Sequence, residues 1–277
     1  MRLSRFLIIL LLAWSGVRAD EKSGASYDFV IKGGRIIDPE TNLDRVGLDL
    51  GITGWTVTAL SSTPLKGARE IDASGLVVAP GFIDVLSYDP NEVGVWNKLA
   101  DGVTTNLGMH GTTTDPLRWF SVYEKRRLPL HYGGSFSYPQ ARVKLKIDRY
   151  SPATEQQIRE MYSMGEAALL NGCIGISISL EYMPGVSPEE CLSMMRLAAK
   201  YKVPVFYHVR YSDVDPPGTN LEALQEVVGY ARETGAAIHI DHINSTGGTF
   251  SMRQSLAFLN EARAAGVDVT ACTYPYD

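Results

Sequence analysis

The sequence predicts an α/β fold, an incomplete TIM-type (β/α)8 barrel of about seven strands preceded by a small β-rich subdomain. After residue 75, short apolar strands alternate with helical stretches, a pattern typical of parallel βα units. Before it, short alternating strands are separated by glycine and Asp-Pro turns. The 277 residues are 45% hydrophobic and 21% charged, which is ordinary for a globular protein with a large core.

Residues 1–19 have the three regions of a secretory signal peptide. Arg2 and Arg5 form a basic start, a short apolar run follows, and Ala19 ends a small-x-small cleavage site. The alternative is an uncleaved membrane anchor, but the apolar run is shorter than the roughly 20 residues that span a bilayer. We therefore expect a secreted or periplasmic protein with no stable membrane anchor.

Charge and cysteine content limit the partners and the types of metal site. The formal net charge is −5 and no run of Lys and Arg is present, so nucleic acid is not an expected partner. Cys173, Cys191 and Cys272 are odd in number, widely spaced and lack a CxxC arrangement. This excludes a structural zinc knuckle, and we expect buried free thiols.

The segment 20–75 is expected to be the N-terminal part of a small β-sandwich domain. It contains short strands near residues 27–31, 35–37, 46–50 and 56–60, in a sheet of about five strands that ends near Asp72. Gly33 and Gly34 are expected to turn the chain between the first two strands.

The segment 76–277 is expected to be a truncated barrel. It is shorter than the roughly 250 residues of a complete barrel and carries seven strands, so we expect the chain to be an N-terminal fragment of a longer protein. The alternative, a doubly wound open sheet, lacks the glycine-rich phosphate loop expected after the first strand. The strands are predicted at 76–85, 103–109, 130–136, 173–178, 203–209, 236–243 and 267–273, and helices at 154–171, 188–202, 220–235 and 251–266.

Three of the five histidines fall at the carboxyl ends of predicted barrel strands. His110 ends the second strand, His208 the fifth and His242 the sixth. Active sites of such barrels lie at this face, and three imidazoles there suit one zinc ion with positions left for water and substrate. For any one of these histidines alone, a hydrogen-bonded core residue is the better interpretation, whereas three at equivalent strand ends favour a metal site. His131 starts its strand, and His239 has the opposite strand parity to His242, so neither is given a role.

Arg210 is a candidate substrate-binding residue. It lies two residues after His208 and so shares its side of the strand. It could bind a substrate carboxylate through a bidentate hydrogen bond, or form a surface ion pair with Asp213 or Asp215. The loop 181–185, which follows the fourth strand, is a candidate substrate loop.

These motifs together resemble the amidohydrolase superfamily, and within it the D-aminoacylases, or N-acyl-D-amino-acid deacylases. Single motifs are common, but their combined order is specific, and the resemblance covers nearly all of residues 27–277. The matching segments are DFVIKGGRIID at 28–38, IDASGLVVAPGFID at 71–84, GIS at 175–177 with LEYMPG at 180–185, YHVR at 207–210, HIDH at 239–242, and DVTA at 268–271 with YPY at 274–276.

The departures from the family pattern concern the metal ligands. The family has a His-x-His pair after the first strand, where this chain has Leu86 and Tyr88. The cysteine ligand of D-aminoacylases, in a Gly-Asn-Cys-Gly turn, corresponds to His110. A family lysine two residues after the sixth-strand histidine is replaced by Asn244. The metal-linked Asp of the eighth strand, which is the expected general base, would lie beyond residue 277.

The resemblance implies one metal position with all three ligand places kept, at His110, His208 and His242, and a second position that is lost. A protein of this kind would hydrolyse a C–N bond of a small amide, such as an N-acyl amino acid, with metal-activated water. Arg210 would hold the substrate carboxylate and Tyr182 would line the pocket. The alternative is a catalytically inactive pseudoenzyme or binding protein, which Leu86 and Tyr88 favour.

Overall fold

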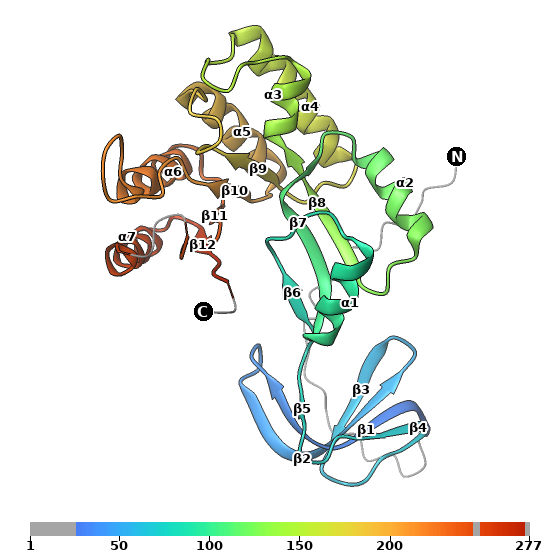
Figure 1. Cartoon of the computed structure of the whole chain (residues 1–277). Coiled ribbons are helices and arrows are strands. Elements are labelled where there is room, and N and C mark those ends of the chain that lie inside the picture. Colours follow the sequence, from blue (N-terminus) through green and yellow to red (C-terminus); the bar gives the residue numbers. More distant parts are fainter. Residues whose placement is uncertain (1–25, 246–249, 275–277) are drawn as a thin grey trace. The chain divides into compact units, whose positions relative to one another are not determined.

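The computed structural model describes residues 26–245 and 250–274 (Figure 1). The predicted signal peptide, residues 1–19, lies outside the described residues. The chain divides into two compact units, residues 1–80 and residues 81–277. None of the helices in the described ranges combines the length and apolar character needed to cross a membrane.

The smaller unit is a five-stranded mixed sheet. Its strands follow the order β3-β2-β1-β4, with β5 also beside β1; β2 is antiparallel to β1 and to β3, whereas β4 and β5 run parallel to β1. The small core under this sheet comprises Ile36, Leu48 and Leu50. The strands are β1 (Ser26–Asp38), β2 (Leu43–Thr53), β3 (Thr56–Ser61), β4 (Lys66–Asp72) and β5 (Val77–Val78).

Two sequence expectations about this unit were wrong. Gly33 and Gly34 do not form a turn, because β1 runs through them as one strand with irregular pairing to β2. Gly33 has a φ of +68°, and a Cβ on Gly34 would lie only 2.7 Å from Val78 Cγ2, so both glycines serve a bulged strand that packs closely. The predicted first barrel strand, 76–85, is also split, since β5 pairs with β1 and only β6 (Phe82–Asp84) joins the barrel sheet.

The larger unit contains the predicted partial barrel. Seven strands form one curled parallel sheet, and they follow one another in chain order from one edge, β6, to the other, β12 (Figure 1). The predicted number, order and direction of the strands are therefore confirmed. Besides β6, they are β7 (Val103–Thr113), β8 (His131–Ser137), β9 (Ile176–Ser179), β10 (Val205–His208), β11 (Ile238–Ile240) and β12 (Val269–Ala271).

The four predicted helices are present within two residues at each end, and three shorter ones were not predicted. Thr154, Ser187 and Thr219 begin their helices with capping boxes, which explains why these starts could be recognised from sequence. The predicted helices are α4 (Glu155–Leu170), α5 (Pro188–Tyr201), α6 (Asn220–Thr234) and α7 (Met252–Ala264); the others are α1 (Glu92–Ala100), α2 (Pro116–Arg126) and α3 (Tyr138–Lys144).

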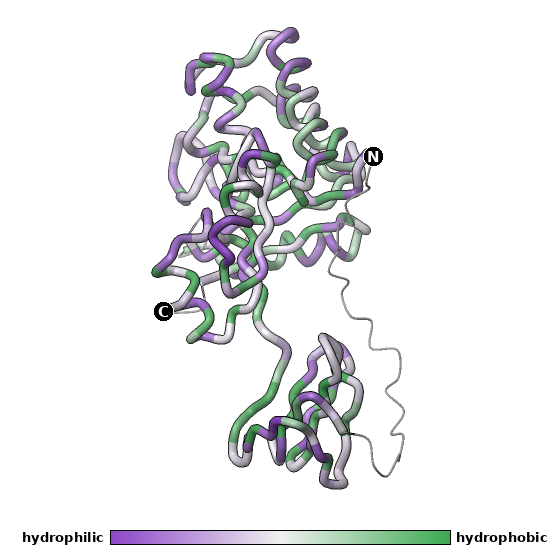
Figure 2. Tube along the Cα trace, turned by 90° about the vertical axis from the view of Figure 1, so that its right-hand side faces the viewer, coloured by the Kyte–Doolittle hydropathy of each residue, from purple (hydrophilic) through white to green (hydrophobic). Residues whose placement is uncertain are grey.

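The core of the larger unit lies between the sheet and the helices. Along the helices the chain alternates repeatedly between hydrophilic and hydrophobic residues, as expected for helices that bury one face (Figure 2). Phe136, Ile176 and Tyr207 from the strands and Leu197 from α5 are fully buried. All three cysteines are free thiols; Cys173 and Cys191 are buried and Cys272 is partly exposed.

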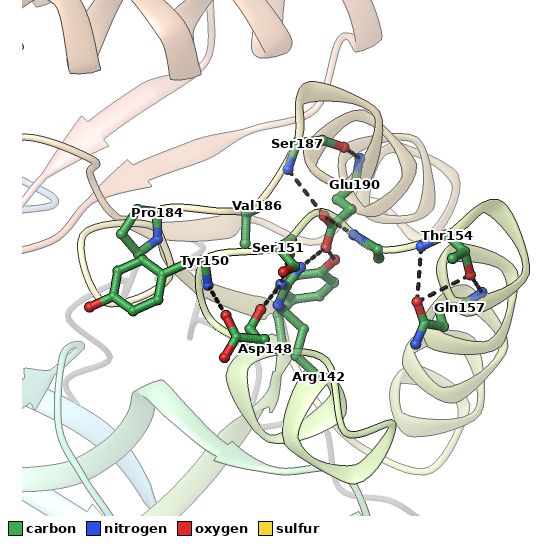
Figure 3. Close-up of polar contacts among 12 residues, drawn as sticks. Arg142, Asp148, Tyr150, Ser151, Thr154, Gln157, Pro184, Val186, Ser187 and Glu190 are labelled. Atoms are coloured by element: carbon green, nitrogen blue, oxygen red, sulfur yellow. Dashed lines mark hydrogen bonds and ion pairs between the residues drawn. The ribbon is translucent and has the colours of Figure 1, made fainter.

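A buried ion pair joins α3 to the start of α5. The side chains of Arg142 and Glu190 point toward each other, and both are nearly inaccessible to solvent (Figure 3). Glu190 also accepts hydrogen bonds from the Tyr138 hydroxyl at 2.5 Å and from the backbone of Ala153 at 2.9 Å. Arg142 donates to two backbone carbonyls of the loop before α4. These bonds connect α3, the loop before α4 and the start of α5, and so help to fix how the three helices pack.

Candidate metal centre

His110 lies in an irregular part of β7. Between the pairs Gly108–Gly134 and Thr113–Phe136, four residues of β7 face a single residue of β8. The Thr112 hydroxyl bridges this gap, donating to the Ser135 carbonyl at 2.8 Å and accepting from the Ser135 N–H at 2.9 Å. Gly111, the residue after His110, has a φ of +95°, which favours glycine. This bulge sets the direction of the His110 side chain at the carboxyl end of the sheet.

His208 and His242 come from two neighbouring strands. His208 is the last residue of β10, and His242 follows the end of β11 by two residues. The His242 backbone adopts a φ of +26°, and its N–H donates to Cys272 Sγ at 3.3 Å. Both histidines are almost fully buried, with 4% and 6% of their surface exposed. The parallel strands therefore bring residues that are far apart in sequence to the carboxyl end of the sheet.

The structure brings the three predicted histidines together. The ring centroids of His110 and His208 are 5.8 Å apart, those of His110 and His242 5.5 Å, and those of His208 and His242 4.8 Å. One ligand nitrogen from each ring lies within 4.8 Å of the others. Tetrahedral zinc holds imidazole nitrogens about 3.4 Å apart, so side-chain movements on the order of 1 Å would bring all three to a common ion.

The surroundings favour the neutral form of two of these imidazoles, those of His110 and His242. Burial lowers the pKa of His110, and the neighbouring His208 lowers it further. Burial likewise lowers the pKa of His242 to about 4, with added repulsion from His208 and His110. Neutral imidazole is the form that binds a metal, so the site is ready to bind an ion near neutral pH.

The donor set also fits a metal ion. His208 Nδ1 is buried and has no hydrogen-bond partner among the described residues. A buried polar atom without a partner is costly, and a bound ion would satisfy it. Three imidazole nitrogens without a thiolate are a ligand set that zinc accepts, with a fourth position left for water or substrate.

Each of the three histidines lies against a tyrosine. Tyr88 stacks on His110 with ring centroids 5.0 Å apart, Tyr182 lies 4.7 Å from His208, and Tyr274 lies 5.8 Å from His242. All three tyrosines are exposed, so each histidine has a solvent-accessible aromatic ring beside it. Tyr182, predicted as a pocket residue, is therefore beside the candidate metal centre. Its pKa is raised, first by burial and then by the nearby Glu181, which keeps the phenol a hydrogen-bond donor.

The first strand of the barrel sheet, β6, and the described residues just after it supply no second set of metal ligands. Leu86 has no donor atom, and the Tyr88 ring stacks on His110. Asp84, the nearest carboxylate of this strand, forms an ion pair with Lys98 at 2.7 Å and accepts the Leu86 N–H at 3.2 Å. The positions of the family's His-x-His pair thus hold an apolar side chain and a stacking ring.

Arg210 is held by other parts of the protein. Its Nε and Nη2 donate to the Glu226 carboxylate at 2.9 and 2.7 Å, and two further N–H groups donate to the carbonyls of Pro184 and Val186. Neither Asp213 nor Asp215, the acids expected as alternatives, pairs with it in the described part of the chain. Arg210 thus fastens the 181–186 loop to α6, and its binding of a substrate carboxylate stays a prediction.

The sequence reasoning missed the role of Glu181. Its Oε2 lies 2.5 Å from His208 Nε2, and the Ser212 hydroxyl donates to the same oxygen at 2.8 Å. The sequence contained a signal for this contact. Glu181 follows β9 by two residues, and β9 is parallel and adjacent to β10, so Glu181 lies at the same end of the sheet as His208. His239, which was given no role, is buried beside Phe206 and bonds Thr270 Oγ1 through Nδ1 at 2.8 Å. His131 is exposed at the start of β8.

Comparison with known proteins gives related sequences and folds, although no protein-family model matches the chain. N-acyl-D-glutamate deacylase of Alcaligenes xylosoxydans xylosoxydans is 29% identical over 283 residues, which are 90% of this chain and 57% of that protein. The crystal structure of N-acyl-D-glutamate deacylase from Bordetella bronchiseptica, complexed with zinc and a phosphonate inhibitor, superposes with a TM-score of 0.79 at 26% identity. That match covers 91% of this chain and 59% of that one.

A crystal structure of D-aminoacylase, described as defining a subset of amidohydrolases, gives the same TM-score of 0.79 at 22% identity. The match covers 90% of this chain and 59% of that one, and at this identity it shows the fold alone. The chain thus spans less than three fifths of the length of each of these proteins.

Proposed function

We propose that this chain holds one zinc ion on His110, His208 and His242 and serves in the hydrolysis of a small amide. The chain belongs to the amidohydrolase superfamily and is a homologue of its N-acyl-D-amino-acid deacylases. The bond cleaved is a C–N bond other than a peptide bond, as in an N-acyl amino acid. The convergence of these three imidazoles at the carboxyl end of the sheet is the observation that carries the proposal.

A zinc ion at this position would act as a Lewis acid toward the amide carbonyl and toward water. The chain's own residues prepare the site for it. Burial keeps His110 and His242 neutral, so they offer lone pairs instead of a repelling positive charge. The bulge in β7 and the left-handed backbone at His242 hold these two side chains in place.

The substrate would lie on the exposed side of the histidine cluster, among the three tyrosines. Their rings offer apolar surface for an acyl group, and the protonated phenol of Tyr182 offers a hydrogen-bond donor. N-acyl amino acids fit this description, and they are the substrate class named for the deacylase relatives. A small-molecule amide is thus the expected partner.

A second candidate function is ligand binding without catalysis. The replacement of the family's His-x-His pair by Leu86 and Tyr88 favours it, because a protein that no longer hydrolyses its ligand need not keep the second metal position. Both functions use the single metal site, but only the first predicts that the bound amide is hydrolysed.

The test is hydrolysis of N-acyl-D-glutamate and other N-acyl-D-amino acids, measured through release of the free amino acid. It uses the zinc-loaded protein extended to include the eighth-strand Asp that is expected as the general base. The N-acyl-L-amino acids show the chirality preference, and a His208→Ala variant is the control. We expect turnover that requires zinc and is lost in the variant. Saturable substrate binding without turnover would establish the binding function instead, and neither binding nor turnover would contradict both.

A further inference from the structure

Glu181 makes a direct polar contact with the histidine cluster. Its Oε2 lies 2.5 Å from His208 Nε2, close enough for a hydrogen bond. An ionised carboxylate can only accept, so an ionised Glu181 would place the proton of this bond on Nε2. The other ring nitrogen, Nδ1, is buried and has no partner among the described residues. The two nitrogens of His208 therefore have different surroundings.

Glu181 is in turn held in position. The Ser212 hydroxyl donates to the same Oε2 at 2.8 Å, from the segment that follows β10. Arg210 binds the carbonyls of Pro184 and Val186, which fastens the loop that begins with Glu181. The carboxylate is thus supported by two neighbouring residues of one segment, as expected for a group that must hold a fixed direction.

We propose that Glu181 is a positioning residue of the metal centre, whose carboxylate holds the proton of His208 on Nε2 and leaves the Nδ1 lone pair for the ion. Carboxylate–histidine–metal arrangements of this kind fix both the tautomer and the orientation of the imidazole. The inference rests on the proposed function, since it assumes that His208 binds the metal. It adds an acidic residue that acts on the ion only through His208.

The tautomer of His208 in the metal-free chain provides a readout independent of activity. Long-range proton–nitrogen NMR correlations of ¹⁵N-histidine-labelled protein separate protonated from unprotonated ring nitrogens, and a His208→Ala variant identifies the His208 signals. At mildly alkaline pH we expect the proton on Nε2. In Glu181→Leu we expect a mixture of both tautomers, and in Glu181→Gln, which keeps one acceptor oxygen, an intermediate result. A proton on Nδ1 in the parent, or unchanged signals in Glu181→Leu, would overturn the proposal.

Zinc affinity, measured by competition with a coloured chelator, provides the second readout. We expect zinc to bind about 10- to 100-fold more weakly to Glu181→Leu than to the parent. Glu155→Gln, the same change of charge on an exposed glutamate of α4, should bind zinc like the parent. If the parent binds no zinc but shows the Nε2 tautomer, the proposed function fails and the Glu181–His208 pairing stands. If all variants bind zinc equally, the positioning role fails and the metal centre stands.

Discussion

The phenol ring of Tyr88 stacks on the imidazole ring of His110, with centroids 5.0 Å apart and an angle of 15° between the planes. A position that carries a metal ligand in the family that the sequence resembles thus packs here against His110, a proposed ligand.

Substitutions of Tyr88 test whether its ring or its hydroxyl matters. We expect Tyr88→Phe to bind zinc as the parent does, because stacking is kept and the phenol is not a ligand. Tyr88→Ala should bind zinc about two- to fivefold more weakly, since an aromatic pair contributes about 0.5–1 kcal/mol. Calorimetric titration of the metal-free proteins with zinc measures both. A large loss of affinity in Tyr88→Phe would identify the phenol oxygen as a ligand.

The buried pair of Arg142 and Glu190 should be essential for stability. Glu190→Gln leaves the Arg142 charge buried without its partner and places an amide against the donors of Tyr138 and Ala153. We expect the free energy of unfolding to fall by about 3–5 kcal/mol, measured from urea transitions. Glu155→Gln, which breaks an exposed pair with Arg159, is the matched control and should unfold like the parent. Equal transitions for all three proteins would show that the buried pair contributes nothing.

His239 should make the fold sensitive to acid. Burial lowers its pKa in the folded protein from 6.5 to about 4, so the unfolded chain binds the proton more readily. Its contribution to stability is complete above pH 6.5 and is lost as the pH falls toward about 4; it amounts to at most about 3 kcal/mol. We expect His239→Gln to reduce the slope of unfolding free energy against pH in this window. His131→Gln, at an exposed histidine, should leave the slope as it is. A steep slope retained in His239→Gln would assign the acid sensitivity to other groups.

Arg210 should control the order of the loop that contains Tyr182. Lysine cannot form the bidentate pair with Glu226 and at the same time donate to both loop carbonyls, so Arg210→Lys should loosen residues 181–186. Hydrogen exchange followed by mass spectrometry should show faster exchange in this loop. Arg196→Lys, which alters an exposed pair with Glu233, should show no such change. Unchanged exchange in Arg210→Lys, together with weaker substrate binding, would instead support the predicted contact with a substrate carboxylate.

Much of this architecture is readable from local patterns. Capping boxes at Thr154 and Ser187, apolar strand segments and histidines at strand ends are local signals, and they predicted the parallel sheet and the gathering of His110, His208 and His242. Strand pairings between segments far apart in the chain were harder to predict from the sequence. The transfer of Val77 and Val78 to the small sheet depends on β1, which lies about 40 residues earlier in the chain.

The candidate site shows the same difference. The bond of Arg210 to Glu226 and the contact of Glu181 with His208 join side chains from separate βα units, and no periodicity within either segment reports them. The three short helices were missed because each has few residues in which a helical period could show. Sequence therefore indicated where the candidate ligands lie, whereas the side chains that contact them became visible only in the fold.

The zinc content of the purified chain shows whether His110, His208 and His242 hold one metal ion. Elemental analysis after exhaustive dialysis, on the parent and on His110→Ala, His208→Ala and His242→Ala, gives the number of ions per chain and identifies their ligands. We expect one equivalent of zinc in the parent and a large loss in each variant. Two equivalents in the parent, or undiminished zinc in the three variants, would contradict this assignment.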